Sequence, residues 1–400
     1  MTYNFSWTDF SEKADTQDFN SIYSINEQTE LNIFGDTVVC HTFIEGDNYP
    51  ALKLIKNQYK EKISIIYIDP NYNTEKKTFT YNDNFSEKQD KHSSWLSFMF
   101  RRLTLAKELL KDDGCIFIAI GQDELYNLKL LCDKIFGEEN FINDFMWLHG
   151  KGKKDNWSRT MQQSNLCYAK NKKKLKPFLD FEYTSWAKTN SDNDSRGPWF
   201  SGSISFDEKR SNPKHPNYYK IVSPSGIEWQ RQWLIHQEEM QKLISQNKIY
   251  WGKAPKYNNV PRQKIFNGEK TEIIPKNIID CAQTTREAQN HVDTLLNEQG
   301  SFDNPKPVDL IKHLIKITNM QNDSIIMDFF AGSGTTLEAV HQLNREDNGT
   351  RNCIVIQKPE PIENKSSKFK TIAELCYTRI AQILCNTTDS LKYFKVEEKD

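Results

Sequence analysis

The chain has 400 residues and almost balanced charge, with 53 Lys and Arg residues against 54 Asp and Glu residues. This length is sufficient for more than one domain, whereas the balanced charge excludes nucleic-acid binding through bulk charge alone. Neither a membrane span nor a secretion signal is expected, because long apolar blocks are missing. Eight scattered cysteines without a CxxC pair favour a reduced, cytoplasmic protein, with Cys115, Cys353 and Cys385 expected in the core.

Apolar runs alternate with helical patterns in the first third of the chain. The run ISIIYI (63–68) is apolar throughout, which is typical of a strand buried on both faces of a parallel sheet. A helical spacing of apolar residues follows over 95–114 and ends in Gly114, and a second buried strand is predicted over 115–120. A further helix is predicted over 123–137. This alternation predicts a doubly wound α/β layer.

The middle of the chain has a different composition. From about residue 150 to 275 it is rich in polar, aromatic and turn residues, and helical periodicity is clear only around 236–246. Regular patterning returns from about residue 305, with strands predicted over 324–330 and 353–357. We therefore expect an α/β domain that is split in sequence by an insertion. The predicted boundaries are 1–150 for the first part of this domain, 151–300 for the insertion, and 301–400 for the second part.

The segment MDFFAGSGTTLEAV combines a strand, a glycine turn and a helix. The strand is expected to end between Asp328 and Phe330, the chain turns on Gly332 and Gly334, and the helix begins near Thr335. Glycines let the backbone approach a ligand, and the helix N-terminus offers free N–H groups. Alone, this pattern fits a tight turn as well as a cofactor site. The acid and the aromatic ring disfavour a phosphate and fit a cationic, carboxylate-bearing, adenosine-containing ligand.

The stretch IYIDPNYNT carries the first predicted strand directly into an acid, a proline and an aromatic ring. Asp69 could cap a helix, but a cap does not explain the Pro–x–Tyr that follows it. Together, DPNY (69–72) and FAGSG (330–334) resemble the paired D-P-P-Y and F-x-G-x-G motifs of amino-methyltransferases. The blocks EGDNYPALKLI, GEENFINDFMW and FDNPKPVDLIKHLI extend this resemblance over most of the chain.

The order of the two motifs makes the chain similar to β-class DNA adenine-N6 methyltransferases, in which the acidic motif comes first. Within that class it resembles the modification (Mod) subunits of type III restriction-modification systems. The resemblance implies a Rossmann-like fold of class I methyltransferases, circularly permuted, with a doubly wound mixed sheet and an inserted target-recognition domain. It also implies S-adenosylmethionine as the cofactor.

The resemblance assigns a role to each part of the acidic motif. The Asp69 carboxylate and the Pro70 carbonyl would accept the two N–H groups of adenine N6 and orient the nitrogen toward the methyl sulfonium. Tyr72 would stack on an adenine that has rotated out of the duplex. Further candidates for the pocket wall, which are as often core residues, are Phe79, Tyr81 and Phe85.

The resemblance also implies a set of cofactor contacts. The implied cofactor-binding residues are Asp328, Phe330, Gly332, Gly334, Asp47, Lys306 and Gln357. The ribose hydroxyls usually meet an acid at the end of the next strand, and Gln357 occupies that place, with Glu360 three residues later. The eight histidines show no metal-binding spacing, and methyl transfer from a sulfonium needs no metal.

Asn71 stands where the family pattern has its second proline. That proline fixes its own φ and restricts Pro70, so that the Pro70 carbonyl points at the base. Either surrounding packing holds the loop and the enzyme is active, or the site is impaired and only cofactor and DNA binding remain. We favour an active enzyme, because Asp69, Pro70 and Tyr72 are retained, and expect it to be slower than an Asn71→Pro variant.

The predicted function is site-specific methylation of adenine N6 in double-stranded DNA by base flipping, as the modification component of a restriction-modification system. The alternative is a catalytically impaired DNA-binding or specificity subunit that acts with a partner. A small-molecule or protein methyltransferase is disfavoured by the long aromatic and basic insertion. Family analogy predicts a homodimer, and any DNA cleavage needs a separate restriction subunit because the sequence has no GxxxxGK[ST] loop.

Basic residues in the middle of the chain are candidates for DNA-backbone contact. The clusters are Lys151, Lys153, Lys154 and Lys172 to Lys174. They are interleaved with the aromatic residues Trp157, Trp199, Tyr218, Tyr219 and Trp229. Such clusters fit solvated loops equally well, and no single residue of the insertion can be assigned to a base from the sequence.

Overall fold

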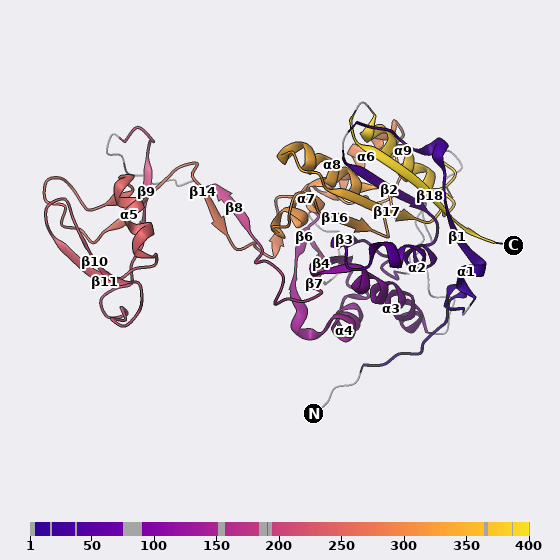
Figure 1. The fold of residues 1–400 in the computed structure, drawn as a ribbon, viewed down its shortest axis with the longest axis horizontal. Helices are drawn as coiled ribbons and strands as arrows, with labels where there is room; N and C mark the ends of the chain where they lie inside the picture. The colour runs from indigo at the N-terminus through magenta and orange to yellow at the C-terminus, as the bar shows by residue number, and fades with distance from the viewer. Residues whose placement is uncertain are drawn as a thin grey trace. The chain divides into compact units, whose positions relative to one another are not determined.

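The computed structural model describes residues 5–16, 18–36, 38–74, 90–150, 157–183, 190, 194–363, 367–385 and 387–399. The chain forms two compact units, one made of Met1–Leu179 with Pro275–Asp400 and the other of Asp180–Ile274. Segments from both ends of the sequence therefore build the first unit (Figure 1). The second unit covers a narrower range than the insertion predicted over 151–300.

A mixed sheet of eleven strands runs through the described part of the first unit. Its strands are β1 (Tyr23–Glu27), β2 (Cys40–Glu45), β3 (Ile63–Ile68), β4 (Leu110–Ile120), β5 (Phe141–Asp144), β6 (Met146–Leu148), β7 (Gln162–Ala169), β15 (Ile278–Ile279), β16 (Ile325–Asp328), β17 (Asn352–Gln357) and β18 (Ser390–Glu398). The order is β1-β18-β2-β17-β16-β3-β4-β7-β6-β15, and β5 also pairs with β7. The six strands from β18 to β4 are parallel, whereas β1 and β7 are antiparallel to their neighbours β18 and β4.

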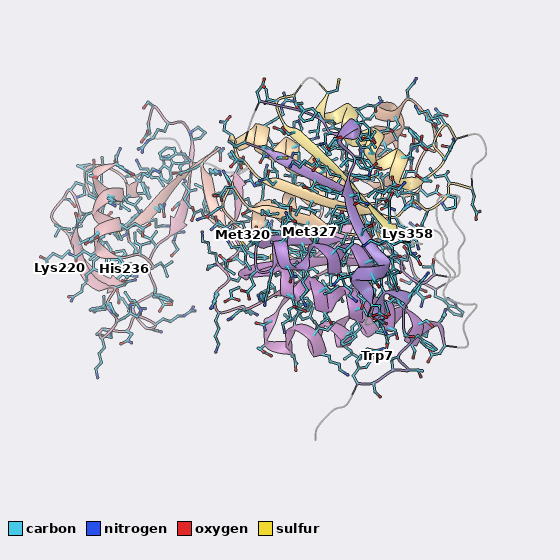
Figure 2. All side chains as sticks on the ribbon, turned by 45° about the vertical axis from the view of Figure 1, so that its right-hand side comes forward. Trp7, Lys220, His236, Met320, Met327 and Lys358 are labelled. Atoms are coloured by element: carbon cyan, nitrogen blue, oxygen red, sulfur yellow. The ribbon has the colours of Figure 1, made fainter. Side chains whose placement is uncertain are left out.

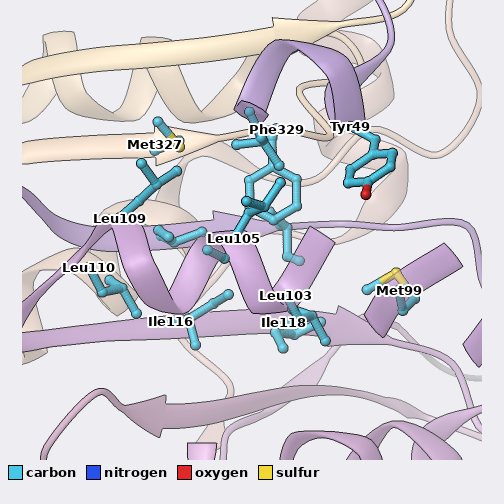
Figure 3. Close-up of a cluster of buried hydrophobic side chains, with 14 of the residues drawn as sticks. Tyr49, Met99, Leu103, Leu105, Leu109, Leu110, Ile116, Ile118, Met327 and Phe329 are labelled. Carbon is cyan, nitrogen blue, oxygen red and sulfur yellow. The ribbon is translucent and has the colours of Figure 1, made fainter. Parts of the chain in front are cut away.

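Helices cover both faces of this sheet. The first face carries α2 (Asn48–Tyr59), α3 (Lys91–Leu109) and α4 (Leu125–Phe136), and the second carries α7 (Val308–Ile317), α8 (Thr335–Asp347) and α9 (Ile372–Leu384). Neighbouring strand residues alternate between the two cores, as Ile66 packs on the first face and Ile65 on the second. Figure 3 shows α3, β4 and β16 meeting in the first core. The doubly wound architecture is thus confirmed.

The remaining helices of the first unit are short or peripheral. They are α1 (Phe19–Ile22), α6 (Thr285–Leu296) and the 3₁₀ turns η1 (Lys13–Asp15), η2 (Thr29–Leu31) and η3 (Glu138–Asn140). α6 packs with α9 in a small apolar cluster. Among the described residues, no helix is both long and apolar enough to cross a membrane.

The helix predicted over 95–114 ends earlier than expected. Its last residue is Leu109, and Leu110 already pairs with Ile63 of β3 in the sheet. Gly114 therefore lies inside β4 and does not end the helix. A Cβ atom there would lie 2.9 Å from the backbone oxygen of Ser64. The prediction that Cys385 lies in the core is wrong, because this residue is exposed just after α9. Cys115 and Cys353 are buried as predicted.

The second unit has a small core of its own. Its elements are β8 (Asp180–Tyr183), β9 (Trp199–Ser203), β10 (Tyr218–Val222), β11 (Glu228–Gln232), α5 (Gln237–Ser245), β12 (Ile249–Tyr250), β13 (Arg262–Phe266) and β14 (Lys270–Ile273). Trp233 and Met240 are fully buried at its centre, together with Tyr219. Trp199 is also buried. Tyr219 and Trp199 therefore serve the interior of the unit.

Candidate active site

Four neighbouring parallel strands bring the predicted residues to one edge of the sheet. Asp69 follows β3, Asp328 ends β16, Gln357 ends β17, and Asp47 comes two residues after β2. These strands adjoin in the order β2-β17-β16-β3, with Ile326 of β16 paired to Ile65 of β3. The carboxyl ends of parallel strands meet at the same edge, where α/β folds bind ligands.

A cavity of about 390 Å³ lies at this edge and is lined by both motif loops. The predicted residues that line it are Asp47, Asp69, Lys306, Asp328, Phe330, Gly332 and Gln357. Lining residues that the sequence reasoning missed include Phe10, Glu12, Asn48, Tyr67, Arg102 and Phe302. Pro70, Tyr72 and Gly334 are not among the lining residues. Phe79, Tyr81 and Phe85 lie outside the described residues.

The two oxygens of the Asp69 carboxylate are both engaged. Lys306 Nζ lies 2.5 Å from Asp69 Oδ2, and the Tyr72 hydroxyl donates to Asp69 Oδ1 over 2.6 Å. Lys306 also lies 5.4 Å from the centre of the Tyr72 ring. Only 10% of the lysine side chain is exposed. Lys306, which the resemblance assigned to the cofactor, therefore also joins its own segment to the acidic loop.

Side chains from α3 and α4 hold the acidic loop on both sides of Tyr72. Trp95, which is fully buried, donates its indole N–H to the Asn71 carbonyl over 2.7 Å. Asn73 has a left-handed φ of 55° and donates its amide to a carboxylate oxygen of Glu124. The structure therefore provides specific contacts around Asn71 where the family pattern has a second proline.

Glu124 is a fully buried carboxylate at the N-terminus of α4. Besides Asn73, it accepts a hydrogen bond from the Asn127 amide over 2.7 Å, and His92 Nδ1 lies 2.7 Å from the oxygen that Asn73 contacts. Loss of a partner would leave an oxygen of this buried carboxylate without a hydrogen bond, which is energetically costly. Glu124 therefore holds its partners in fixed positions. Tyr72 itself packs beside Gly121, where a Cβ atom would lie 3.0 Å from the ring.

The glycine loop takes its shape from its own backbone and from the elements behind it. Gly332 and Gly334 have φ values of 54° and 86°, which other residues adopt only with strain. The Gly332 N–H donates to the side-chain oxygen of Gln357 over 2.7 Å. Gly334 faces away from the cavity, because its added Cβ would lie 3.1 Å from the sulfur of Cys376 in α9. In this structure, Gln357 thus supports the loop directly.

A buried ion-pair network supports the glycine loop from behind. Arg379 of α9 is fully buried and donates to the Ser333 hydroxyl over 2.7 Å, to the Thr335 hydroxyl over 3.0 Å, and to Glu338 over 2.6 Å. Glu338 also lies 2.7 Å from His291. Burial alone would raise the pKa of Glu338, but His291 and Arg379 hold this pKa at about 2. The network fixes the start of α8.

Asp328 is a buried acid with an unusual ionisation. One of its oxygens accepts the Phe330 N–H over 2.9 Å, and the other accepts the Thr336 hydroxyl. Burial is the main reason that the pKa of Asp328 rises to about 7, and the nearby Asp69 raises it further. The two hydrogen bonds and Lys306 oppose this rise. A cation in the cavity would favour the ionised form of this carboxyl.

Charged residues from the N-terminal segment and α3 close another side of the cavity. Arg102 lies 2.6 Å from Glu12 and 3.2 Å from Asp47, and Asp47 lies 3.3 Å from Lys358, which Figure 2 labels. Burial raises the pKa of Asp47, yet Arg102 and Lys358 bring it below its ordinary value. Burial raises the pKa of Glu360, which also lines this cavity.

One cluster outside the cavity has residue types that bind metals. The ligand atoms of His41, His341 and Asp389 all lie within 4.8 Å of one another. However, the Cys353 N–H donates to His41 Nδ1 over 3.0 Å, so the neutral ring carries its proton on Nε2, the nitrogen that faces the cluster. His341 Nδ1 lies 2.7 Å from Asp389. His41 Nε2 lies 3.6 Å from Asp389, and a protonated nitrogen cannot bind a metal, so the cluster is not a preformed metal centre.

The basic clusters are only partly described. Lys151, Lys153 and Lys154 lie outside the described residues. Lys172 donates to the Phe141 carbonyl over 2.8 Å, and Lys174 pairs with Asp112 over 2.6 Å. Trp157 is 94% exposed.

Several known proteins are similar to this chain over most of its length. The family model N6_N4_Mtase, described as DNA methylase, matches residues 63–368. The type III restriction-modification enzyme StyLTI Mod subunit of Salmonella typhimurium is 32% identical over 397 residues, which cover 91% of this chain and 60% of that protein. The chain thus spans about 60% of the length of that relative.

Two further matches extend over most of both chains. The type II methyltransferase M.KpnI of Klebsiella pneumoniae is 29% identical over 384 residues, covering 88% of this chain and 89% of that protein. The solved structure of PvuII DNA methyltransferase, which is cytosine-N4-specific, is 12% identical with a TM-score of 0.41, covering 89% of this chain and 99% of that one. Since the family model covers most of its length, this chain belongs to the DNA methylase family.

Proposed function

We propose that this protein transfers a methyl group from S-adenosylmethionine to the N6 atom of adenine in double-stranded DNA. The observation that carries the proposal is the shared cavity, in which Asp69 of the acidic loop lies next to the glycine loop. Its volume suits a ligand of this size, and Gly332 lets the backbone approach closely. The partly exposed Asp69 carboxylate and the buried Asp328 carboxylate suit a cationic ligand. When bound, the cofactor supplies an activated methyl group on its sulfonium.

The acidic loop prepares the acceptor nitrogen. The lone pair of adenine N6 is delocalised into the ring, so the amine needs acceptors that orient it. The Asp69 carboxylate accepts one N–H and the Pro70 carbonyl the other. The incoming amine replaces the Tyr72 hydroxyl on Asp69 Oδ1, which releases the Tyr72 ring to stack on the extruded base. Lys306 keeps the other oxygen in place.

The contacts of the acidic loop favour an active enzyme over an impaired specificity subunit. Asn71 lacks the rigidity of proline, but Trp95 holds its carbonyl and Glu124 holds Asn73, two residues later. The fully buried Glu124 thus orders the loop, as an active site requires. The choice of adenine rests on the Asp at the first motif position and on the similarity to Mod subunits.

The test is transfer of labelled methyl groups from the cofactor to DNA of mixed sequence, followed by identification of the methylated nucleoside. The wild type is expected to yield N6-methyladenine. Asp69→Ala should reduce the single-turnover rate by about 10³-fold, as expected for loss of an acid–base group. Asp323→Ala, which changes an exposed acid before the other end of β16, is the matched control and should keep the wild-type rate.

Two results would contradict the proposal. Wild-type protein that binds both the cofactor and DNA but transfers no label would support the impaired specificity subunit. If the product is N4-methylcytosine, the target base is cytosine and the assignment to adenine is wrong. The same assay with small-molecule or protein acceptors in place of DNA should show no transfer. Transfer to such an acceptor would indicate a methyltransferase of another class.

The similarity to Mod subunits also supports a place in a restriction-modification system. We propose a homodimer that acts in the cytoplasm, where one chain holds DNA for methylation by the other, with a separate restriction subunit as a possible partner. Sedimentation of the protein with a short duplex tests the dimer, with two chains per duplex expected. One chain per duplex with full activity would contradict it.

A further inference from the structure

The hydroxyl of Tyr67 stands out among the polar groups of the cavity. Its side chain is 2% exposed, lines the cavity, and has no hydrogen-bond partner among the described residues. A buried hydroxyl without a partner is unfavourable in a folded protein, and most such groups are paired. An unpaired hydroxyl at a cavity wall is therefore a candidate ligand contact.

The sheet places this hydroxyl next to both acids of the cavity. Ile66 of β3 pairs with Met327 of β16, so the next residues, Tyr67 and Asp328, lie side by side on one face of the sheet. Asp69 comes two residues after Tyr67, just beyond the end of β3, and lines the same cavity. The phenol therefore shares the cavity wall with both carboxylates.

Neither carboxylate accepts a hydrogen bond from the phenol. The oxygens of Asp69 are bonded to Tyr72 and Lys306, and those of Asp328 to the Phe330 N–H and the Thr336 hydroxyl. Burial and the two acids raise the pKa of Tyr67 well above its ordinary value, so the phenol keeps its proton. It can both donate and accept a hydrogen bond.

We propose that the Tyr67 hydroxyl binds the amino-acid end of the cofactor. This inference rests on the proposed function, because it names a contact of the same cavity. The two carboxylates attract a cation, and the amino-acid end of S-adenosylmethionine carries an ammonium next to a carboxylate. A neutral phenol hydrogen-bonds either group, and the carboxylates that share its wall of the cavity draw the ammonium toward it.

The test compares Tyr67→Phe with wild type by calorimetric titration of two ligands. S-adenosylmethionine carries the amino-acid end, and 5′-methylthioadenosine lacks it. The variant should bind S-adenosylmethionine about tenfold more weakly, as expected for one hydrogen bond, and methylthioadenosine within about twofold of wild type. The melting temperature of the ligand-free variant should be equal to or above that of wild type, because the substitution removes an unpaired buried hydroxyl.

Tyr168→Phe is the matched control. The Tyr168 hydroxyl is also on a buried side chain, but it donates to Asp133 over 2.7 Å, and the residue does not line the cavity. Its loss should lower the melting temperature and leave the affinity for S-adenosylmethionine unchanged. The two Tyr→Phe changes are thus expected to have different effects on stability and on binding.

Three results would overturn the inference. These are unchanged affinity of Tyr67→Phe for S-adenosylmethionine, equal weakening of both ligands, and a fall in melting temperature like that of Tyr168→Phe. A wild-type protein that neither binds S-adenosylmethionine nor methylates DNA counts against the proposed function itself. An active wild type with an unaffected Tyr67→Phe variant counts against this inference alone.

Discussion

The two loops that form the cavity are stabilised in different ways. The glycine loop after β16 is shaped by left-handed glycines, by the start of α8 and by the buried Arg379 behind it. The acidic loop after β3 depends on side chains from elsewhere, namely Trp95, Glu124 and Lys306. A loop built mainly from its own sequence can be recognised from a short motif, whereas a loop held by distant partners cannot.

Removal of Arg379 should have the largest effect and should break the glycine loop. Arg379→Met leaves Glu338 buried without its arginine, so the free energy of unfolding should fall by about 3–5 kcal/mol. Lys316→Met is the control, because Lys316 pairs with Glu346 at the surface and should contribute less than about 1 kcal/mol. Denaturant unfolding measures both. Similar small losses would show that the network does not support the loop.

The pH dependence of cofactor binding tests the Asp328 side of the cavity. A bound cation prefers the ionised carboxyl, whose pKa is about 7 in the free protein. Affinity for S-adenosylmethionine should therefore fall by up to about tenfold per pH unit below pH 7, and Asp328→Asn should abolish this dependence. Titration calorimetry between about pH 6 and pH 8 is the measurement.

The stability of the ligand-free protein should respond to pH in the opposite direction. Because the folded-state pKa of Asp328 is raised, its contribution to stability is complete below the ordinary value of 3.8 and is lost as pH rises through about 7. Cofactor affinity and ligand-free stability thus have opposite slopes in this window. Parallel slopes would contradict the assignment of Asp328 to a cationic ligand.

Loss of the Asn73 amide should lower the methylation rate by displacing the acidic loop, and it should leave the glycine loop unaffected. Asn73→Gly keeps the left-handed backbone but removes the contact with Glu124. The single-turnover methylation rate should fall about tenfold through misplacement of Tyr72 and Asp69, with unchanged cofactor affinity. Asn127→Ala is the control, because it contacts the other oxygen of Glu124. An unchanged rate in Asn73→Gly would show that this contact does not position the loop.

Restoration of the family proline should give the smallest effect. Asn71→Pro should raise the single-turnover rate about two- to threefold by restricting the loop. In an Asn73→Gly background the same change should restore part of the lost rate, since the proline then replaces a missing contact. A rate equal to or below that of wild type for the single variant Asn71→Pro would refute the idea that Asn71 limits activity.

Sequence patterns predicted most of the regular elements, because continuous apolar runs identify strands buried on both faces. They failed where the fold overrides a local pattern. Leu110 continues a helical pattern but pairs with Ile63, so the helix ends before it. Trp199 and Tyr219 looked available for DNA, yet a small domain without long helices needs such rings for its core.

The motifs identified the two loops of the candidate site but not the residues behind them. Glu124 and Arg379 are ordinary helix residues in the sequence, and only the fold shows that they are buried with specific partners. Tyr67 reads as one more apolar strand residue. Only the fold shows that its hydroxyl lies near Asp328 and has no hydrogen-bond partner in the described part of the chain.

The second unit leaves and rejoins the rest of the chain through a paired ribbon. Asp180 of β8 is the partner of Ile273 of β14, so the first and last strands of the unit are hydrogen-bonded neighbours. A segment with adjoining ends can be exchanged as a cassette, because the remaining chain has to accommodate only the same two attachment points. Exchange of this unit therefore leaves the α/β unit and its cavity unchanged.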